Sequence, residues 1–215
     1  MPLIHLLIML QVVTAVQVST KNGKLKGDFV RKQFDVGYYV FRNIPYANLI
    51  NNNSSLKYPQ PITKWEEVKD STIGPQSSQG NATNEIQENR NCLHLTIYTR
   101  KIRRWLPPSM ARTYQVSPVE VYFLGCTINS GENRTESVTG NILKEDVVKV
   151  MVSHRRGIPV STEDIAENDQ LLALQWIKDN ILYFGGDPQR VAVFQGHSGL
   201  ADIDINRLSL RANGT

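Results

Sequence analysis

The stretch from Asp169 to Gly199 constrains the fold of this chain more than any other part of its sequence. Its first half carries apolar residues at helical spacing, which predicts an amphipathic helix with one face to bury. Two glycines and a proline then follow, as is typical of a helix end. Asp164 and Glu167, three residues apart, predict a capping box ahead of this helix. The predicted buried face comprises Leu171, Leu174, Ile177, Ile181 and Phe184.

A short strand and a sharp turn are predicted directly after the helix. Residues 191–194 are all apolar, as expected of a strand buried on both faces of a parallel sheet. The turn carries His197 and Ser198 between glycines. A strand-to-helix turn with a serine at its apex is one way to present a nucleophile. Whether this turn does so depends on the rest of the chain.

Further strands are predicted along the chain. A hairpin is indicated at Asn22-Gly23, where an alternating pattern breaks. Residues 51–61 and 70–91 are rich in polar and turn-forming residues and are predicted to be loops. Late strands alternate with helical segments, which favours an α/β fold with a parallel sheet and right-handed crossovers. The other predicted strands are residues 40–47, 92–98, 119–124 and 147–153.

The charge distribution argues against a nucleic-acid partner. The chain has 215 residues, enough for one domain with a proper core, and a net charge of +4. Only Lys101, Arg103 and Arg104 cluster, and a solvated loop is favoured over a binding patch there. The sequence holds only Cys92 and Cys126, whose spacing suggests neither a disulfide scaffold nor a metal site. No cofactor is predicted.

The N-terminal segment predicts a secreted protein. Residues 1–15 have an apolar centre, and Val13 and Ala15 stand at the −3 and −1 positions of a cleavage site. This signal peptide is too short to span a bilayer, and no later apolar run reaches about 20 residues, so no membrane anchor is predicted. The mature domain is expected to span residues 16–215. Glycosylation in the secretory route is predicted at the N-x-S/T sites Asn52, Asn53, Asn81, Asn133 and Asn213.

Several blocks of sequence together resemble one family. In order they are YYVFRNIPYA, ENRNCLHLTIYT, PVEVYFLGCTINSG, DVVKVMVSHRRG and DQLLALQWIKDNILYFGGDPQRVAVF, followed by GHSG. From about Val16 to Gly199 the chain resembles the N-terminal part of the type-B carboxylesterases, the cholinesterase-like branch of the α/β-hydrolases. The resemblance implies an incomplete α/β-hydrolase fold, namely the N-terminal part of a doubly wound, mostly parallel sheet with flanking helices. The domain would be truncated after the nucleophile turn.

That family hydrolyses carboxylic esters with a serine, a histidine, an acidic residue and an oxyanion hole of backbone N–H groups. Its nucleophile turn reads glycine, any residue, serine, any residue, glycine. An ungapped match from Phe194 places His197 at the serine position. Treating Gln195 as an insertion restores Ser198 and follows it with Gly199, but places Leu200 at the last glycine position. Neither register is intact, so Ser198 is a degenerate nucleophile candidate.

The remaining catalytic parts also depart from the family pattern. The three oxyanion glycines correspond to Gly125, Cys126 and Thr127, so two of them have gained side chains, and Gly199 is the further residue expected at the oxyanion hole. In the family, the acid and the base lie far beyond the nucleophile, and neither is expected in this chain. His94 is expected to be structural, and His197 stands too close to Ser198 in sequence to act as its base.

The resemblance also implies structural pairs. Arg155 and Asp169 match an arginine–aspartate pair that ties a strand to the following helix, and they are expected to pair here. Lys57 and Arg90 stand where the family has opposite charges. The family's disulfide partner of Cys92 is missing, which leaves Cys92 unpaired unless it bonds Cys126.

Three functions fit these observations. The first is a secreted, glycosylated, carboxylesterase-like protein without esterase activity, with a role in adhesion, in matrix contacts or in binding an unidentified protein. The alternative is a fragment of an active serine ester hydrolase with Ser198 as nucleophile. A third is a decayed paralog that depends on a partner, because half of a doubly wound sheet leaves an unpaired edge.

Overall fold

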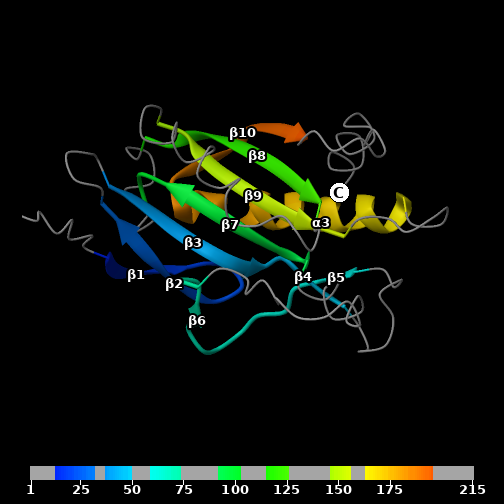
Figure 1. Cartoon of the computed structure of the whole chain (residues 1–215), viewed down its shortest axis with the longest axis horizontal. Helices are drawn as coiled ribbons and strands as arrows, with labels where there is room; N and C mark the ends of the chain where they lie inside the picture. Colours follow the sequence, from blue (N-terminus) through cyan, green and yellow to red (C-terminus); the bar gives the residue numbers. More distant parts are fainter. Residues whose placement is uncertain are drawn as a thin grey trace, which may run out of the picture.

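A computed structural model describes residues 13–31, 37–49, 59–73, 92–102, 115–125, 146–155 and 163–195. Its main feature is an eight-stranded sheet in the order β1-β2-β3-β7-β9-β8-β10, with β6 beside β2 (Figure 1). The strands of this sheet are β1 (Val13–Ser19), β2 (Lys24–Val30), β3 (Tyr38–Pro45), β6 (Lys69–Asp70), β7 (His94–Thr99), β8 (Ser117–Gly125), β9 (Val148–His154) and β10 (Gly186–Gln195).

The N-terminal half of the sheet is antiparallel, apart from the short β6, which pairs in parallel with β2. β1 and β2 form the predicted hairpin. Gly23 in its turn has a φ of 148°, a backbone angle that residues with a side chain rarely adopt. β1 begins at Val13, so it includes the last three residues of the predicted signal peptide. Cleavage of that peptide stays a prediction. β3 pairs antiparallel with both β2 and β7, and β7 pairs antiparallel with β9.

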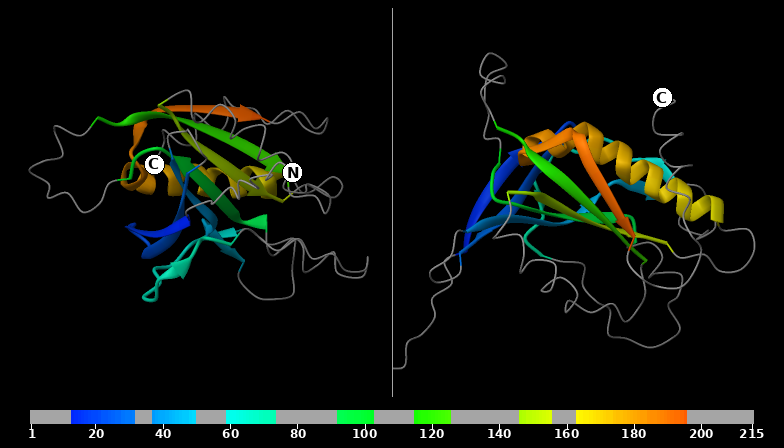
Figure 2. Two further views of the ribbon diagram at one scale, coloured as in Figure 1. Left: turned by 60° about the vertical axis from the view of Figure 1, so that its left-hand side comes forward. Right: turned by 90° about the horizontal axis from the view of Figure 1, so that it is seen from above.

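The C-terminal half is parallel, as the alternation of strands and helix predicts. β8 pairs in parallel with β9 on one side and with β10 on the other. The helix α3 (Glu163–Asn180) connects β9 to β10 and runs along one face of the sheet (Figure 2). The α/β fold class is therefore confirmed, with a mixed sheet in the described part of the chain.

Helix α3 ends as the sequence predicts but begins earlier than expected. A 3-10 turn (Ile181–Phe184) continues it, and Gly185 follows in the left-handed conformation with a φ of 78°. The N–H of Gly185 points back to the carbonyl oxygens of this turn, which closes the helix end. The prediction of Asp164 as the N-terminal cap is wrong, because the helix already includes Glu163.

The buried face of α3 also differs from the prediction. Ile177, Ile181 and Phe184 are buried as expected, but Leu171 and Leu174 are only half-buried. The apolar periodicity misses part of this face because polar side chains of the helix have hydrogen-bond partners at the end of β9 and in the β1–β2 turn. The buried residues of the helix are Ile165, Asp169, Gln170, Ala173, Trp176, Ile177 and Asn180.

Two apolar clusters occupy the two faces of the sheet. The larger lies between the sheet and α3 and includes Val121, Val150 and Trp176. The smaller is formed by Val40, Tyr98 and Met151, and Tyr122 packs against it. A separate pair of short strands, β4 (Ala47–Leu49) and β5 (Pro59–Pro61), lies beside α3. The predicted loop over residues 51–61 is therefore wrong at its end, where residues 59–61 pair with 47–49.

Candidate active site

The carboxyl ends of three parallel strands lie side by side at one end of the sheet. The arrowheads of β8, β9 and β10 point the same way in Figure 1. Gly125, the last residue of β8, lies opposite His154 of β9, and Gln195, the last residue of β10, lies opposite Phe123. In α/β sheets, ligands bind beside the carboxyl ends of the strands. The segment after Gly125 and the turn after Gln195 therefore leave from neighbouring strands.

Most predicted catalytic positions lie beyond these strand ends. Ser198 and Gly199, like Cys126 and Thr127, are outside the described residues, and so are His197 and Leu200. Gly125 is the last described position of the predicted oxyanion segment. The predicted glycosylation sites and the Lys57–Arg90 pair also lie outside the described residues, so these remain predictions.

His154 is the described histidine closest to the candidate site, and its side chain turns inward. Its ring is 8% exposed and lies on the α3 face, in line with Val150 and Val152. Nδ1 lies 2.9 Å from the carbonyl oxygen of Arg155. A carbonyl oxygen can only accept, so Nδ1 carries the proton in this contact. Nε2 lies 3.5 Å from the side-chain nitrogen of Gln170 on α3.

His94 lies on the other face of the sheet. It begins β7 opposite Pro45 and is 9% exposed. Strand alternation places His94 on the side of Tyr98, whereas Leu95 and Ile97 face α3. The two described histidines therefore lie on opposite faces of the sheet and do not form a common site.

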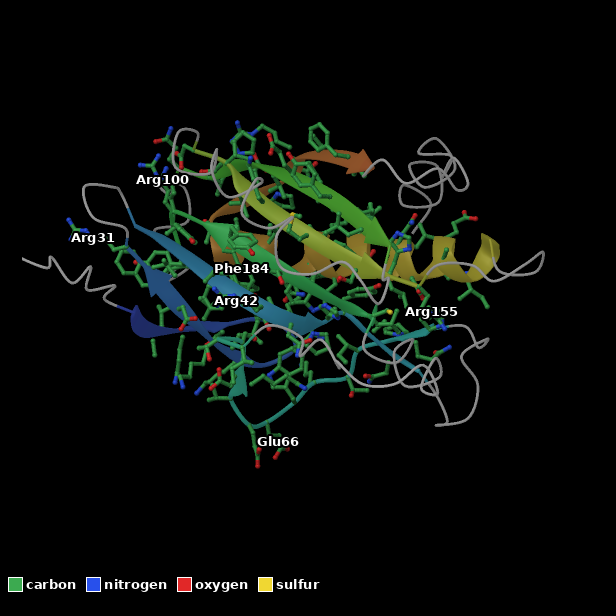
Figure 3. The ribbon with its side chains drawn as sticks, viewed as in Figure 1. Arg31, Arg42, Glu66, Arg100, Arg155 and Phe184 are labelled. Carbon is green, nitrogen blue, oxygen red and sulfur yellow. The ribbon has the colours of Figure 1, made fainter. Side chains whose placement is uncertain are left out.

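Arg155 and Asp169 form a buried ion pair that joins the end of β9 to α3 (Figure 3 labels Arg155). Their side chains are 3% and 0% exposed. Asp169 accepts hydrogen bonds from Nη2 of Arg155 at 2.5 Å, from its Nε at 2.9 Å and from its backbone N–H at 3.1 Å. Arg155 therefore supplies all three of these hydrogen-bond donors to the carboxylate of Asp169. The pair fixes the strand end against the helix.

A buried tyrosine makes a further hydrogen bond to the end of β9. Tyr46, which follows β3, is 1% exposed, and its hydroxyl donates to the carbonyl oxygen of Ser153 at 2.8 Å. Burial, followed by the negative charge of Asp169, raises the pKa of Tyr46 well above its usual value. The hydroxyl is therefore held as a neutral donor.

Cys92 is disulfide-bonded, which decides between the two states that the sequence left open for it, unpaired or bonded. The sequence holds one other cysteine, Cys126, which lies outside the described residues. The strand registers place the start of β7 and the end of β8 beside the same end of β9. β7 and β8 flank β9 on its two sides, with Leu95 opposite Val152 and Gly125 opposite His154. In the sequence, Cys92 comes two residues before β7 and Cys126 comes directly after β8.

Two features, a cluster of metal-ligating side chains and a helix able to cross a bilayer, are absent from the described residues. Among them, no group of three or more histidine, cysteine, aspartate or glutamate side chains is placed to hold a metal ion. Within the same residues, no helix combines the length and the apolar character needed to cross a bilayer.

Comparison with known proteins places this arrangement in a family. The profile of the Carboxylesterase family matches residues 14–215. The chain belongs to this family. It is 31% identical to liver carboxylesterase 1 of Oryctolagus cuniculus over 89% of its own length, and 27% identical to esterase E4 of Myzus persicae over 92%. In both cases it spans 37% of the length of the relative.

Solved structures agree with the fold. Juvenile hormone esterase from Manduca sexta matches 85% of the chain with a TM-score of 0.63 and 20% identity, and the chain covers 36% of that structure. The structure named PNB esterase matches 85% with a TM-score of 0.59 and 25% identity, and 38% of it is covered. The described sheet is therefore part of an α/β-hydrolase fold.

The contact between His154 and Gln170 was not predicted. The sequence does hold a signal for it, since His154 continues the alternation of Val148, Val150 and Val152 toward the helix. Gln170 directly follows Asp169, so a helix anchored by Asp169 also brings Gln170 to the strand. The bond of Cys92 could not be decided from spacing, because the distance between two cysteines depends on strand order.

Proposed function

We propose that this protein is a secreted, glycosylated member of the Carboxylesterase family that binds a partner and does not hydrolyse esters. The observation that carries the proposal is the sequence of the nucleophile turn, which fits the family pattern in neither register. A general base must lie within hydrogen-bond reach of the hydroxyl that it deprotonates. His154, the described histidine nearest to this turn, does not offer such a base, because it donates its Nδ1 proton to a backbone carbonyl and turns its ring toward α3.

The residues around the turn support the same conclusion. An oxyanion hole needs backbone N–H groups in a fixed arrangement with open space in front of them. Cys126 and Thr127 place side chains where glycines serve this purpose in the family. Within one chain Cys126 is the sole possible bonding partner of Cys92, and such a bond would tie the oxyanion segment to the start of β7. The disulfide would then fix the position of the oxyanion segment whether or not a substrate is bound.

The disulfide also supports secretion. Disulfides persist in oxidising compartments and are rare in the cytosol. The predicted signal peptide and the N-x-S/T sites point to the same route. In secreting animal cells, the released protein should begin at Val16 and gain mobility on a gel after treatment with peptide N-glycosidase F. Retention of Met1, or an unchanged mobility, would contradict this part of the proposal.

The decisive experiment asks whether the serine reacts. The purified protein should not be labelled by a fluorophosphonate probe, and it should not hydrolyse p-nitrophenyl butyrate above a heat-denatured control. Rabbit liver carboxylesterase 1, treated in parallel, serves as the positive control. Labelling that disappears in Ser198→Ala would sink the proposal.

A second function is favoured by the strand ends themselves. β8 and β10 run in parallel register, so the nucleophile turn and the oxyanion segment start side by side, as an ester hydrolase requires. The alternative is therefore an ester hydrolase in which Ser198 is the nucleophile and other parts of a longer protein supply the acid and the base. Probe labelling of the product of the full transcript, lost in Ser198→Ala, would support this alternative.

A further inference from the structure

The turn between β1 and β2 carries the dipeptide Asn22-Gly23, and the fold uses both of its residues. Gly23 has a φ of 148°, and a Cβ added to it would lie 2.4 Å from Nε1 of Trp65. A residue with a side chain would therefore meet both backbone strain and the indole ring. Nδ2 of Asn22 donates to the carbonyl oxygen of Ile62 at 3.3 Å, while its Oδ1 accepts from Nδ2 of Asn180 at 3.1 Å. Only a side-chain amide donates and accepts in this way, so the contacts of the turn favour asparagine followed by glycine.

This dipeptide can react with itself, because glycine leaves the backbone nitrogen after an asparagine unhindered. The nitrogen of Gly23 attacks Cγ of Asn22, and the new N–Cγ bond closes a five-membered imide. The Cγ–Nδ2 bond breaks, and Nδ2 leaves as ammonia after taking the proton of the Gly23 N–H. Water then opens the ring at either of its carbonyl carbons, adding its OH to that carbon and its hydrogen to the nitrogen. The product is aspartate or isoaspartate at position 22, and water is the one co-reactant.

The contacts that favour this dipeptide also restrain its reaction in the folded chain. The attacking nitrogen must lose its proton, but the N–H of Gly23 donates to Oγ1 of Thr20 at 3.2 Å. The same hydroxyl donates to the carbonyl oxygen of Gly23 at 2.7 Å. Ring closure would also turn the side chain of Asn22 away from Ile62 and Asn180. The turn must therefore open before the imide forms.

We propose that Asn22 is a deamidation site whose reaction is gated by opening of the β1–β2 turn. The change persists when the turn closes again. A carboxylate has no hydrogen to donate to the carbonyl oxygen of Ile62. Isoaspartate also places a methylene group in the main chain, beside the carbonyl oxygen of residue 22 that accepts from the N–H of Trp65 at 2.8 Å. Either product weakens the contact between the hairpin and residues 62–65. The proposal concerns this turn and is independent of whether Ser198 reacts.

Peptide mapping by mass spectrometry tests the site in the unaltered chain. The chain is incubated at mildly alkaline pH, folded or unfolded in guanidinium chloride, and the peptide that contains residue 22 is followed for the exchange of NH2 for OH. Conversion should be at least about tenfold slower in the folded chain, because several hydrogen bonds must break first. Methylation by protein isoaspartate methyltransferase identifies the isoaspartate product. Equal rates in the folded and the unfolded chain would overturn the proposal.

Variants at Thr20 test the gate. Thr20→Val removes the acceptor of the Gly23 N–H and should speed conversion in the folded chain by about fivefold, the factor that one hydrogen bond contributes to opening. Thr20→Ser keeps the hydroxyl and should react at the unaltered rate. Amide hydrogen exchange at Gly23 should quicken in Thr20→Val by a similar factor, because both reactions start from the open turn. Faster exchange without faster deamidation would overturn the gate. Should Thr20→Val not fold, the comparison of folded with unfolded chain decides the question without a variant.

Discussion

Removal of the charge of Asp169 should destabilise this protein more than most single substitutions. In Asp169→Asn the side chain keeps its shape, but the guanidinium of Arg155 remains buried without a counter-charge. Loss of one partner of a buried ion pair costs about 3–5 kcal/mol. Because a domain is typically stable by about 5–15 kcal/mol, this one change would remove a large share of the folding free energy.

The test is a double-mutant cycle measured by urea unfolding followed by tryptophan fluorescence. Asp169→Asn and Arg155→Met should each cost about 3–5 kcal/mol. In the double variant no charge stays buried, and the cost should fall to about 1–3 kcal/mol, which reflects the buried side-chain amide at position 169 that has lost the guanidinium as its partner. Should a single variant fail to fold, the double variant should fold again. Additive costs, which would give about 6–10 kcal/mol for the double variant, would refute the reasoning.

Three smaller perturbations test other parts of the structure. Tyr46→Phe should cost about 1–3 kcal/mol in urea unfolding, because the buried carbonyl of Ser153 loses its donor; a cost near zero would show that water replaces the hydroxyl. Gly27→Ala should cost about 1–3 kcal/mol, since a Cβ there would lie 2.5 Å from a ring carbon of Phe41 on β3. An unchanged midpoint of urea unfolding would mean that β2 and β3 move apart at no cost in free energy. Hydrogen bonds from the side chain and backbone of Thr72 lower the pKa of Asp70 to about 2. The small stabilisation from this carboxylate is therefore present above its unfolded pKa near 3.8 and lost as the pH falls through about 2. In Thr72→Val the titration midpoint of Asp70, followed by carbon NMR, should rise toward 3.8; an unmoved midpoint would assign the shift to another group.

The strands that could be predicted are those whose side chains alternate or are uniformly apolar. The run predicted at residues 147–153 is β9 at 148–154, and the run at 92–98 is β7 at 94–99. Such patterns follow directly from burial on one or both faces. β5 escaped prediction because its two prolines favour a loop by composition, and its pairing depends on a partner that only the folded chain provides.

The helix shows where pattern analysis fails for a physical reason. Apolar spacing placed Leu171 and Leu174 on the buried face, whereas Asp169 and Gln170 are buried more fully. A polar side chain can take a core position when its hydrogen-bonding groups are satisfied there. Asp169 meets that condition through Arg155, which is 14 residues away in the sequence. The resemblance to a family suggested this pair, and the apolar pattern alone could not.

The ties between β9 and α3 are independent of the residues that would perform catalysis. Arg155 and Asp169 are needed to bury the strand end, whatever the turn after β10 contains. A chain that lost esterase activity would therefore keep this pair under selection for stability, while Cys126 and Thr127 could replace glycines without unfolding it. Restoration of the glycines by Cys126→Gly and Thr127→Gly separates the two demands. If the proposed function is correct, that variant still fails to react with a fluorophosphonate, because its nucleophile turn still fits the family pattern in neither register.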